Sequence, residues 1–133
     1  DSELLDWCAA NLGGPPTIQL EVADLERLDD ADFPFIGLFD IAQDEGLSNP
    51  RLSWNLKLLC GTHNPALTTT TVNGCKLKSY SGRLQAEDLR EVAVAALFRA
   101  GLGIKIKLEG VAVPNQFHPR YYSGMQLTIE KIR

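Results

Sequence analysis

The side chains with the greatest chemical reactivity in this 133-residue sequence are three cysteine thiols and two histidine imidazoles. Thiolate and imidazole are the preferred ligands of zinc, and together they also make nucleophilic pairs. The candidates are Cys60, His63, Cys75 and His118. Their spacing matches no zinc pattern, and Cys60 lies on the inward face of an expected strand, where thiols are common core residues. Because nothing marks an oriented base or an oxyanion site, we expect no metal, no cofactor and no catalytic residue, and hence no enzyme.

The acidic run Asp29, Asp30 and Asp32 is a second group with chemical potential. Carboxylates bind hard cations, but this run lacks the glycine that a calcium loop needs for its turn. Gly101 and Gly103 follow an expected helix, whereas the glycines of a phosphate loop precede one. We therefore interpret residues 23–32 as a solvated acidic linker.

Four lysines, Lys76, Lys78, Lys105 and Lys107, alternate along two expected strands. With tyrosines nearby in sequence, they permit a nucleic-acid-binding interpretation. The sequence pI of about 5.1 argues against it, because dedicated nucleic-acid-binding domains have pI values above about 9. A polar outer sheet face and a basic surface that meets an acidic partner are the alternatives, and we favour the acidic partner.

The charge of the chain is divided between its halves. Residues 1–66 hold 12 acidic and 3 basic side chains, and residues 67–133 hold 5 acidic and 10 basic ones. Opposite charges on one subunit permit a head-to-tail contact between copies. This division favours a protein that binds or assembles.

Length and composition predict a single domain over residues 1–133. The odd number of widely spaced cysteines argues against a disulfide framework and fits a reducing compartment. No apolar run approaches the ~18 residues of a transmembrane helix, so we expect no membrane association.

Hydrophobic periodicity predicts the elements that must position these residues. Apolar residues at helical spacing predict helices over 2–12 and about 85–100, and alternation predicts strands over 17–22, 33–42, 51–60, 104–113 and 121–132. The glycines and prolines of 13–16 end the first helix. The expected fold is α+β: a mostly antiparallel sheet with two helices packed on one face and a protruding β-hairpin arm.

The arm is expected over residues 67–80, around Asn73–Gly74, which is the strongest short signal for a two-residue hairpin turn. The expected register places Val72 opposite Cys75, Thr70 opposite Leu77, and Thr71 opposite Lys76. One face then carries Thr69, Thr71, Lys76 and Lys78. Threonine-rich strands bury little apolar surface, so this hairpin does not have the pattern of a core element.

Two apolar residues of the second expected helix, Val94 and Phe98, fall outside its main apolar stripe. They are either core residues of a helix that is buried on two sides or an interface patch. Periodicity alone does not separate these alternatives.

The order of elements resembles that of the small tail terminator (tail completion) proteins of long-tailed bacteriophages. In that family a helix leads to a strand, a polar loop enters a hairpin at an aromatic-Pro step, and a helix and two strands follow. Here the loop ends in Asp32–Phe33–Pro34 and the hairpin covers 35–60. The resemblance covers nearly the whole chain as an order of elements.

The resemblance implies a homo-oligomeric ring, usually of six copies, in the tail or neck of a virion. Such a ring caps the tail tube, contacts the tail tube protein and the head completion or neck protein, and lets DNA pass through its channel without sequence-specific binding. Assembly would take place in the host cytoplasm. The family has no catalytic residues, and related tube proteins use extended hairpins to contact neighbours.

From the charge pattern we expect the Lys76/Lys78 arm to meet residues 24–32 of the next subunit. The expected interface residues are Lys76, Lys78, Thr69, Thr71, Asp29, Asp30, Asp32, Val94 and Phe98. A head–tail connector or tail tube subunit of the same assembly is an alternative, and a nucleic-acid-binding module is a second.

Overall fold

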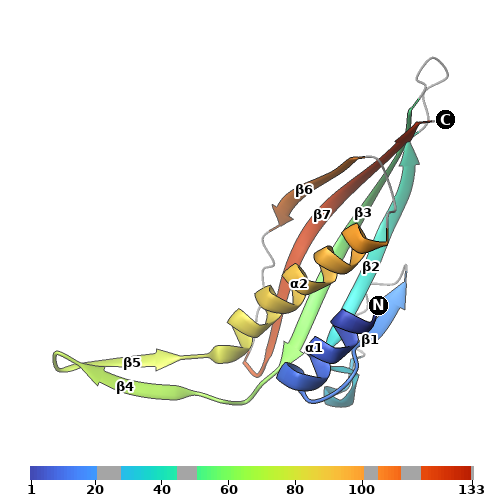
Figure 1. Cartoon of the computed structure of the whole chain (residues 1–133). Coiled ribbons are helices and arrows are strands. Elements are labelled where there is room, and N and C mark those ends of the chain that lie inside the picture. Colours follow the sequence, from blue (N-terminus) through green and yellow to red (C-terminus); the bar gives the residue numbers. More distant parts are fainter. Residues whose placement is uncertain (21–27, 45–50, 101–104, 112–117, 133) are drawn as a thin grey trace.

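Five strands form one twisted sheet, in the order β1-β2-β3-β7-β6 (Figure 1). The computed structural model describes residues 1–20, 28–44, 51–100, 105–111 and 118–132. Only β1 and β2 pair in parallel, and every other neighbouring pair in this sheet is antiparallel. The strands of this sheet are β1 (Thr17–Leu20), β2 (Phe35–Asp44), β3 (Arg51–His63), β6 (Lys105–Val111) and β7 (Arg120–Ile132).

Two helices, α1 (Ser2–Leu12) and α2 (Ser81–Arg99), cover one face of this sheet (Figure 1). The main core lies between the helices and the sheet. Its buried members are Cys8, Ile36, Leu58, Cys60, Leu89, Ala93, Val94 and Leu127. The expected α+β fold is therefore confirmed, with both helices on one face of a mostly antiparallel sheet.

The ends of α1 follow from local sequence. The Asp1 carboxylate accepts a hydrogen bond of 3.0 Å from the Leu4 amide and so caps the first turn. Gly13 ends the helix with a φ of 82°, a left-handed conformation that residues with a Cβ adopt only at a cost.

Helix α2 begins at Ser81, four residues before the boundary near 85 that periodicity predicts. Gly82 lies within this extra turn, and a Cβ at this position would clash with the Tyr121 ring. The glycine lets the helix approach β7 closely. Periodicity missed this turn because its buried member has no side chain to contribute to an apolar pattern.

A smaller apolar cluster covers the other face of the sheet. Phe35 and Leu59 project from β2 and β3 to pack with Leu28 and Tyr122, and Phe33 and Phe39 border them. This second cluster explains why β2 is apolar on both faces.

The segment between β3 and α2 is a separate two-stranded sheet, formed by β4 (Thr68–Val72) and β5 (Cys75–Ser79). Its register is the expected one, with Val72 opposite Cys75 and Thr71 opposite Lys76. Asn73 and Gly74 both have positive φ, 51° and 81°, as a two-residue hairpin turn requires. In Figure 1 this hairpin extends away from the five-stranded sheet, and every residue of its strands is exposed.

One expectation about β1 needs correction. Alternation predicts that Ile18 and Leu20 face the core, and their pairing with Ile36 and Leu38 does place them on the helix-covered side. Both side chains are nevertheless 59% exposed. The helices do not reach far enough to cover the edge strand, so an inward-facing pattern here does not lead to burial.

Several predicted features lie partly or wholly outside the described residues. These are the acidic residues Asp24 and Glu26 of the expected linker and the glycines at 101 and 103. The backbone of Lys105 and Lys107 belongs to β6, but the side chains of these lysines are outside the described part.

Candidate assembly surfaces

The β4–β5 hairpin carries a basic face made of Thr69, Thr71, Lys76 and Lys78. These four residues form two cross-strand pairs, Thr69 with Lys78 and Thr71 with Lys76. All four are exposed. No acidic residue occurs between residues 64 and 86, so nothing in this stretch of sequence offsets the two lysine charges.

The hairpin has a second, apolar face. Val72 and Leu77 lie on it with Thr70 and Cys75, and about half of each of the two aliphatic side chains is exposed. An isolated two-stranded hairpin is only marginally stable in water. Contact with another surface on either face would therefore stabilise the hairpin.

The acidic run does not act as one surface. Asp30 accepts hydrogen bonds from Arg120, at 2.8 Å from Nη2 and 3.2 Å from Nε. His63 Nε2 lies 3.5 Å from the same carboxylate oxygen. Asp30 is thus paired with Arg120 and borders His63 within its own chain, which weakens its expected role as a free partner for the lysines of another subunit.

The pKa values agree with this ion pair. The hydrogen bond from Arg120 lowers the pKa of Asp30, with smaller electrostatic contributions from His63 and Arg120. The same bond raises the pKa of Arg120. The Arg120 guanidinium also stands 5.3 Å above the ring of Phe33, a cation–π arrangement.

The other two members of the run differ from Asp30. Asp32 Oδ2 accepts a hydrogen bond of 2.8 Å from the Asp29 amide, which closes the short 3₁₀ helix η2 (Asp30–Asp32). Asp29 is exposed. Of the three expected acidic contacts, Asp29 is the one whose side chain is best placed to meet another subunit.

The two off-stripe residues of α2 have different surroundings. Val94 is buried in the main core, which favours the core alternative over the interface alternative for this residue. Phe98 is 52% exposed, one turn further along the helix. Phe98 remains available for an interface.

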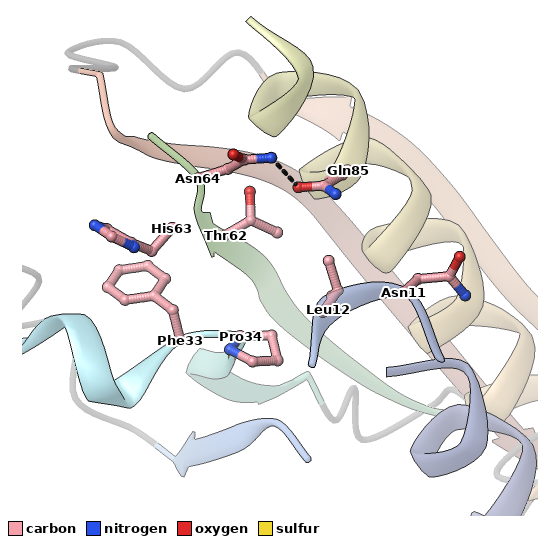
Figure 2. Close-up of a pocket in the computed structure, with 8 residues that line it drawn as sticks. All are labelled: Asn11, Leu12, Phe33, Pro34, Thr62, His63, Asn64 and Gln85. Atoms are coloured by element: carbon pink, nitrogen blue, oxygen red, sulfur yellow. Dashed lines mark hydrogen bonds between the residues drawn. The ribbon is translucent and has the colours of Figure 1, made fainter. Parts of the chain in front are cut away.

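A polar pocket of about 220 Å³ opens at the end of the sheet near the hairpin (Figure 2). Asn64 Nδ2 donates to Gln85 Oε1 at 2.8 Å, and the Thr62 hydroxyl donates to the Gly82 carbonyl at 2.7 Å. Its walls are otherwise mostly neutral. The residues that line it are Asn11, Leu12, Phe33, Pro34, Thr62, His63, Asn64 and Gln85.

These hydrogen bonds fasten the end of β3 to the first turns of α2. The hairpin joins the body between these two elements, so both of its ends are anchored. Next to it, the rings of Tyr80, His118 and Tyr121 pack together, with centroids 5.1 to 6.4 Å apart. His118 Nδ1 lies 2.5 Å from the Tyr121 hydroxyl.

The structure does not bring the candidate thiols and imidazoles together. Cys60 is fully buried in the core, and burial raises its pKa to about 12, which keeps the thiol protonated. Cys75 is exposed on the hairpin, His63 lies beside Asp30, and His118 packs with the tyrosines. Within the described ranges there is no group of three or more His, Cys, Asp or Glu side chains that could hold a metal ion.

Sequence reasoning missed Arg120, and it did not predict that His63 lies beside Asp30. The signal lies in the pairing of β3 with β7, which places His63 directly opposite Arg120. This pairing joins segments far apart in the chain, and no local pattern reveals it. The pocket was missed for the same reason, since its polar side chains come from α1, β3 and α2.

Comparison with protein-family models gives no match, and comparison with curated proteins gives no relative. In the part of the chain that the structure describes, neither helix has the length and apolar character needed to cross a membrane.

Proposed function

We propose that this chain is a structural virion protein, a phage tail terminator that assembles into a ring, caps the tail tube and joins it to the head. The ring contains several copies in head-to-tail contact, and DNA passes through its centre. The proposal rests on the order of elements together with the arrangement of charged surfaces on the subunit.

The observation that carries the proposal is the separation of two complementary surfaces. The exposed basic hairpin leaves the body on one side, whereas α1 and β1 lie on the other (Figure 1). Residues 1–20 and 28–44 contain eight acidic residues and no lysine or arginine, and three of these acids pair with arginines from elsewhere in the chain: Asp1 and Glu3 with Arg99, and Asp30 with Arg120. A closed ring of identical subunits needs two different patches that fit each other, and opposite charges on opposite sides supply such a pair.

In this arrangement Lys76 and Lys78 of one copy face the acidic side of the next. Among the three expected acidic contacts, Asp29 is the best placed to receive them, because Asp30 is paired with Arg120. A contact between exposed charges is weakened by salt. Assembly should therefore weaken as ionic strength rises.

Negative-stain microscopy and light scattering of the purified protein test the proposal. We expect rings with a central hole, and Lys76→Glu/Lys78→Glu should shift the protein towards monomer.

Lys76→Arg/Lys78→Arg keeps the charge and should still assemble, and Arg83→Glu controls for a charge reversal outside the hairpin. Adding Asp29→Lys to the double glutamate variant should restore part of the assembly if these residues meet. Unchanged oligomers in the double glutamate variant would contradict the lysine contact, and monomers of the native chain at high concentration would contradict the ring.

A head–tail connector or tail tube subunit would use the same surfaces. Tubes in place of single rings in the micrographs would favour the tube subunit.

The exposed Thr69, Thr71, Lys76 and Lys78 face also suits a nucleic-acid-binding module, with Tyr80 partly exposed beside it. A salt titration of binding to single-stranded DNA separates the two classes, because a binding module gives a steep negative slope of log K against log salt.

A further inference from the structure

The helix layer leaves part of the sheet uncovered beside α1. Ile18 and Leu20 are exposed on the helix-covered side of β1, next to their partners in β2. A groove of about 220 Å³ adjoins them, between α1, the second half of α2 and strands β1 to β3. Apart from Asp1 its lining is apolar, and it includes Leu4, Ile18, Leu38, Ala96 and Leu97. We call the groove together with Ile18 and Leu20 the apolar groove.

The same molecule has a second exposed apolar surface, on the β4–β5 hairpin. Val72 and Leu77 project from one face of the β4–β5 hairpin, flanked by Thr70 and Cys75. A β-sheet that packs face to face on another lies about 10 Å above it, close to the diameter of a helix. A hairpin laid on the groove would therefore fill the missing place in the helix layer beside α1.

The hairpin of the same chain is not positioned to do this. It extends from the side of the molecule opposite β1, with the body of the sheet and α2 between (Figure 1). A second copy in head-to-tail contact brings its hairpin to the side where the groove opens. Charge favours the same occupant, because the hairpin carries Lys76 and Lys78 without an acid. At the groove, Asp1, Glu3 and Asp6 of the α1 segment outnumber Arg99, which pairs with Asp1 and Glu3.

We infer that the apolar groove is the docking site for the β4–β5 hairpin of a second copy of this chain, which inserts Val72 and Leu77. This inference deepens the proposed function, on which it rests, by naming the surface that receives the hairpin. The apolar face supplies the contact area, and the lysines on the opposite hairpin face supply the electrostatic attraction to the surrounding acidic surface. Both faces of the hairpin are then used, which explains why its sequence alternates although neither face is buried in the single chain.

The natural cysteine on the hairpin gives a direct test. Cys75 is exposed on the apolar face, whereas Cys8 and Cys60 are buried. Ile18→Cys places a second exposed thiol at the edge of the groove. Oxidation of the full-length variant at assembling concentration should give covalent multimers on a non-reducing gel, because docking brings the two thiols of neighbouring copies within reach of a disulfide.

Three controls make the test specific. Ile18→Cys/Cys75→Ser should give no multimers. Moving the hairpin thiol to the opposite face, with Ile18→Cys/Thr71→Cys/Cys75→Ser, should reduce cross-linking strongly, since Thr71 lies on the basic face. Leu84→Cys places an exposed thiol in the first turns of α2, away from the groove, and should not cross-link to Cys75.

The outcomes separate this inference from the proposed ring. Oligomers that form without the cross-link, with both thiols open to maleimide labelling, would overturn the docking site and leave the ring standing. A disulfide within a single chain would show that the hairpin folds back on its own groove and would also overturn the inference. A protein that stays monomeric without cross-links would contradict both the docking site and the ring.

Discussion

The β2–β3 and β4–β5 hairpins each carry a face of apolar side chains, and only the first of these faces is buried. In the first, Ile36, Leu58 and Cys60 project from one face and are buried under the helices. In the second, Val72 and Leu77 project from one face, and about half of each side chain is left exposed by the part of the chain that the structure describes. Alternation determines which side chains share a face, and the presence of another layer determines whether that face is buried. The two hairpins therefore differ in what a substitution should change: folding in one, assembly in the other.

The largest expected effect is in the covered hairpin. Leu58→Ala removes a side chain that is 2% exposed at the centre of the main core. It should lower the free energy of unfolding by about 2–5 kcal/mol, through lost apolar burial and the cavity left behind. Urea denaturation followed by circular dichroism measures this, and a loss below about 1 kcal/mol would mean that the helices do not seal this face.

The next largest loss of stability is expected at the start of α2, where the β4–β5 hairpin joins the rest of the molecule. Gly82→Ala directs a methyl group against the Tyr121 ring, so the first turn of α2 must shift away from β7. We expect a loss of about 1–3 kcal/mol in the free energy of unfolding. Gly14→Ala is a matched control, because no atom stands within 4 Å of the added carbon and this glycine does not have a positive φ. Equal stability of the two variants would contradict the close approach of α2 to β7.

Features that depend on local sequence were predicted correctly in both hairpins. Both were located from local patterns, and the register of β4–β5 was correct in each expected pair, because a two-residue turn fixes it. The inward face of β7 was correct too, with Leu127 fully buried and Ile129 nearly so. Local periodicity and turn chemistry are enough for features of this kind.

Sequence reasoning failed where the outcome depends on partners far away in the chain. Ile18 and Leu20 have the pattern of core residues, but the sequence of a strand does not indicate how far the helix layer above it extends. Asp30 appeared to be one of three similar acids until β7 placed Arg120 beside it. Val94 was ambiguous because α2 contacts both β3 and β7, and two contacts widen the buried stripe of a helix.

A smaller effect on stability is expected from the ion pair between Asp30 and Arg120, which lies in the body of the molecule near the end of β3. Since Arg120 lowers the pKa of Asp30 below its ordinary value of 3.8, the ionised carboxylate favours the folded state. This contribution is fully present above the ordinary pKa and is lost as the pH falls through the lowered one. Asp30→Asn should therefore flatten the dependence of stability on pH below about pH 4. The same slope in both proteins would show that the pair does not favour the folded state. Asp6→Asn, which replaces an exposed aspartate on α1, is the matched control.

The smallest effect on folding, and the sharpest test of the comparison, is expected in the uncovered hairpin. Leu77→Ala shortens a side chain that is 52% exposed, so the free energy of unfolding of the monomer should change by no more than about 0.5 kcal/mol. Association should weaken, because the same side chain is inferred to be buried against a second copy. Dilution in light scattering measures the association, and urea denaturation at a concentration below assembly measures the folding. A variant that loses stability as a monomer would mean that Leu77 packs against the rest of its own chain. The two hairpins would then differ only in how much of their apolar face is buried.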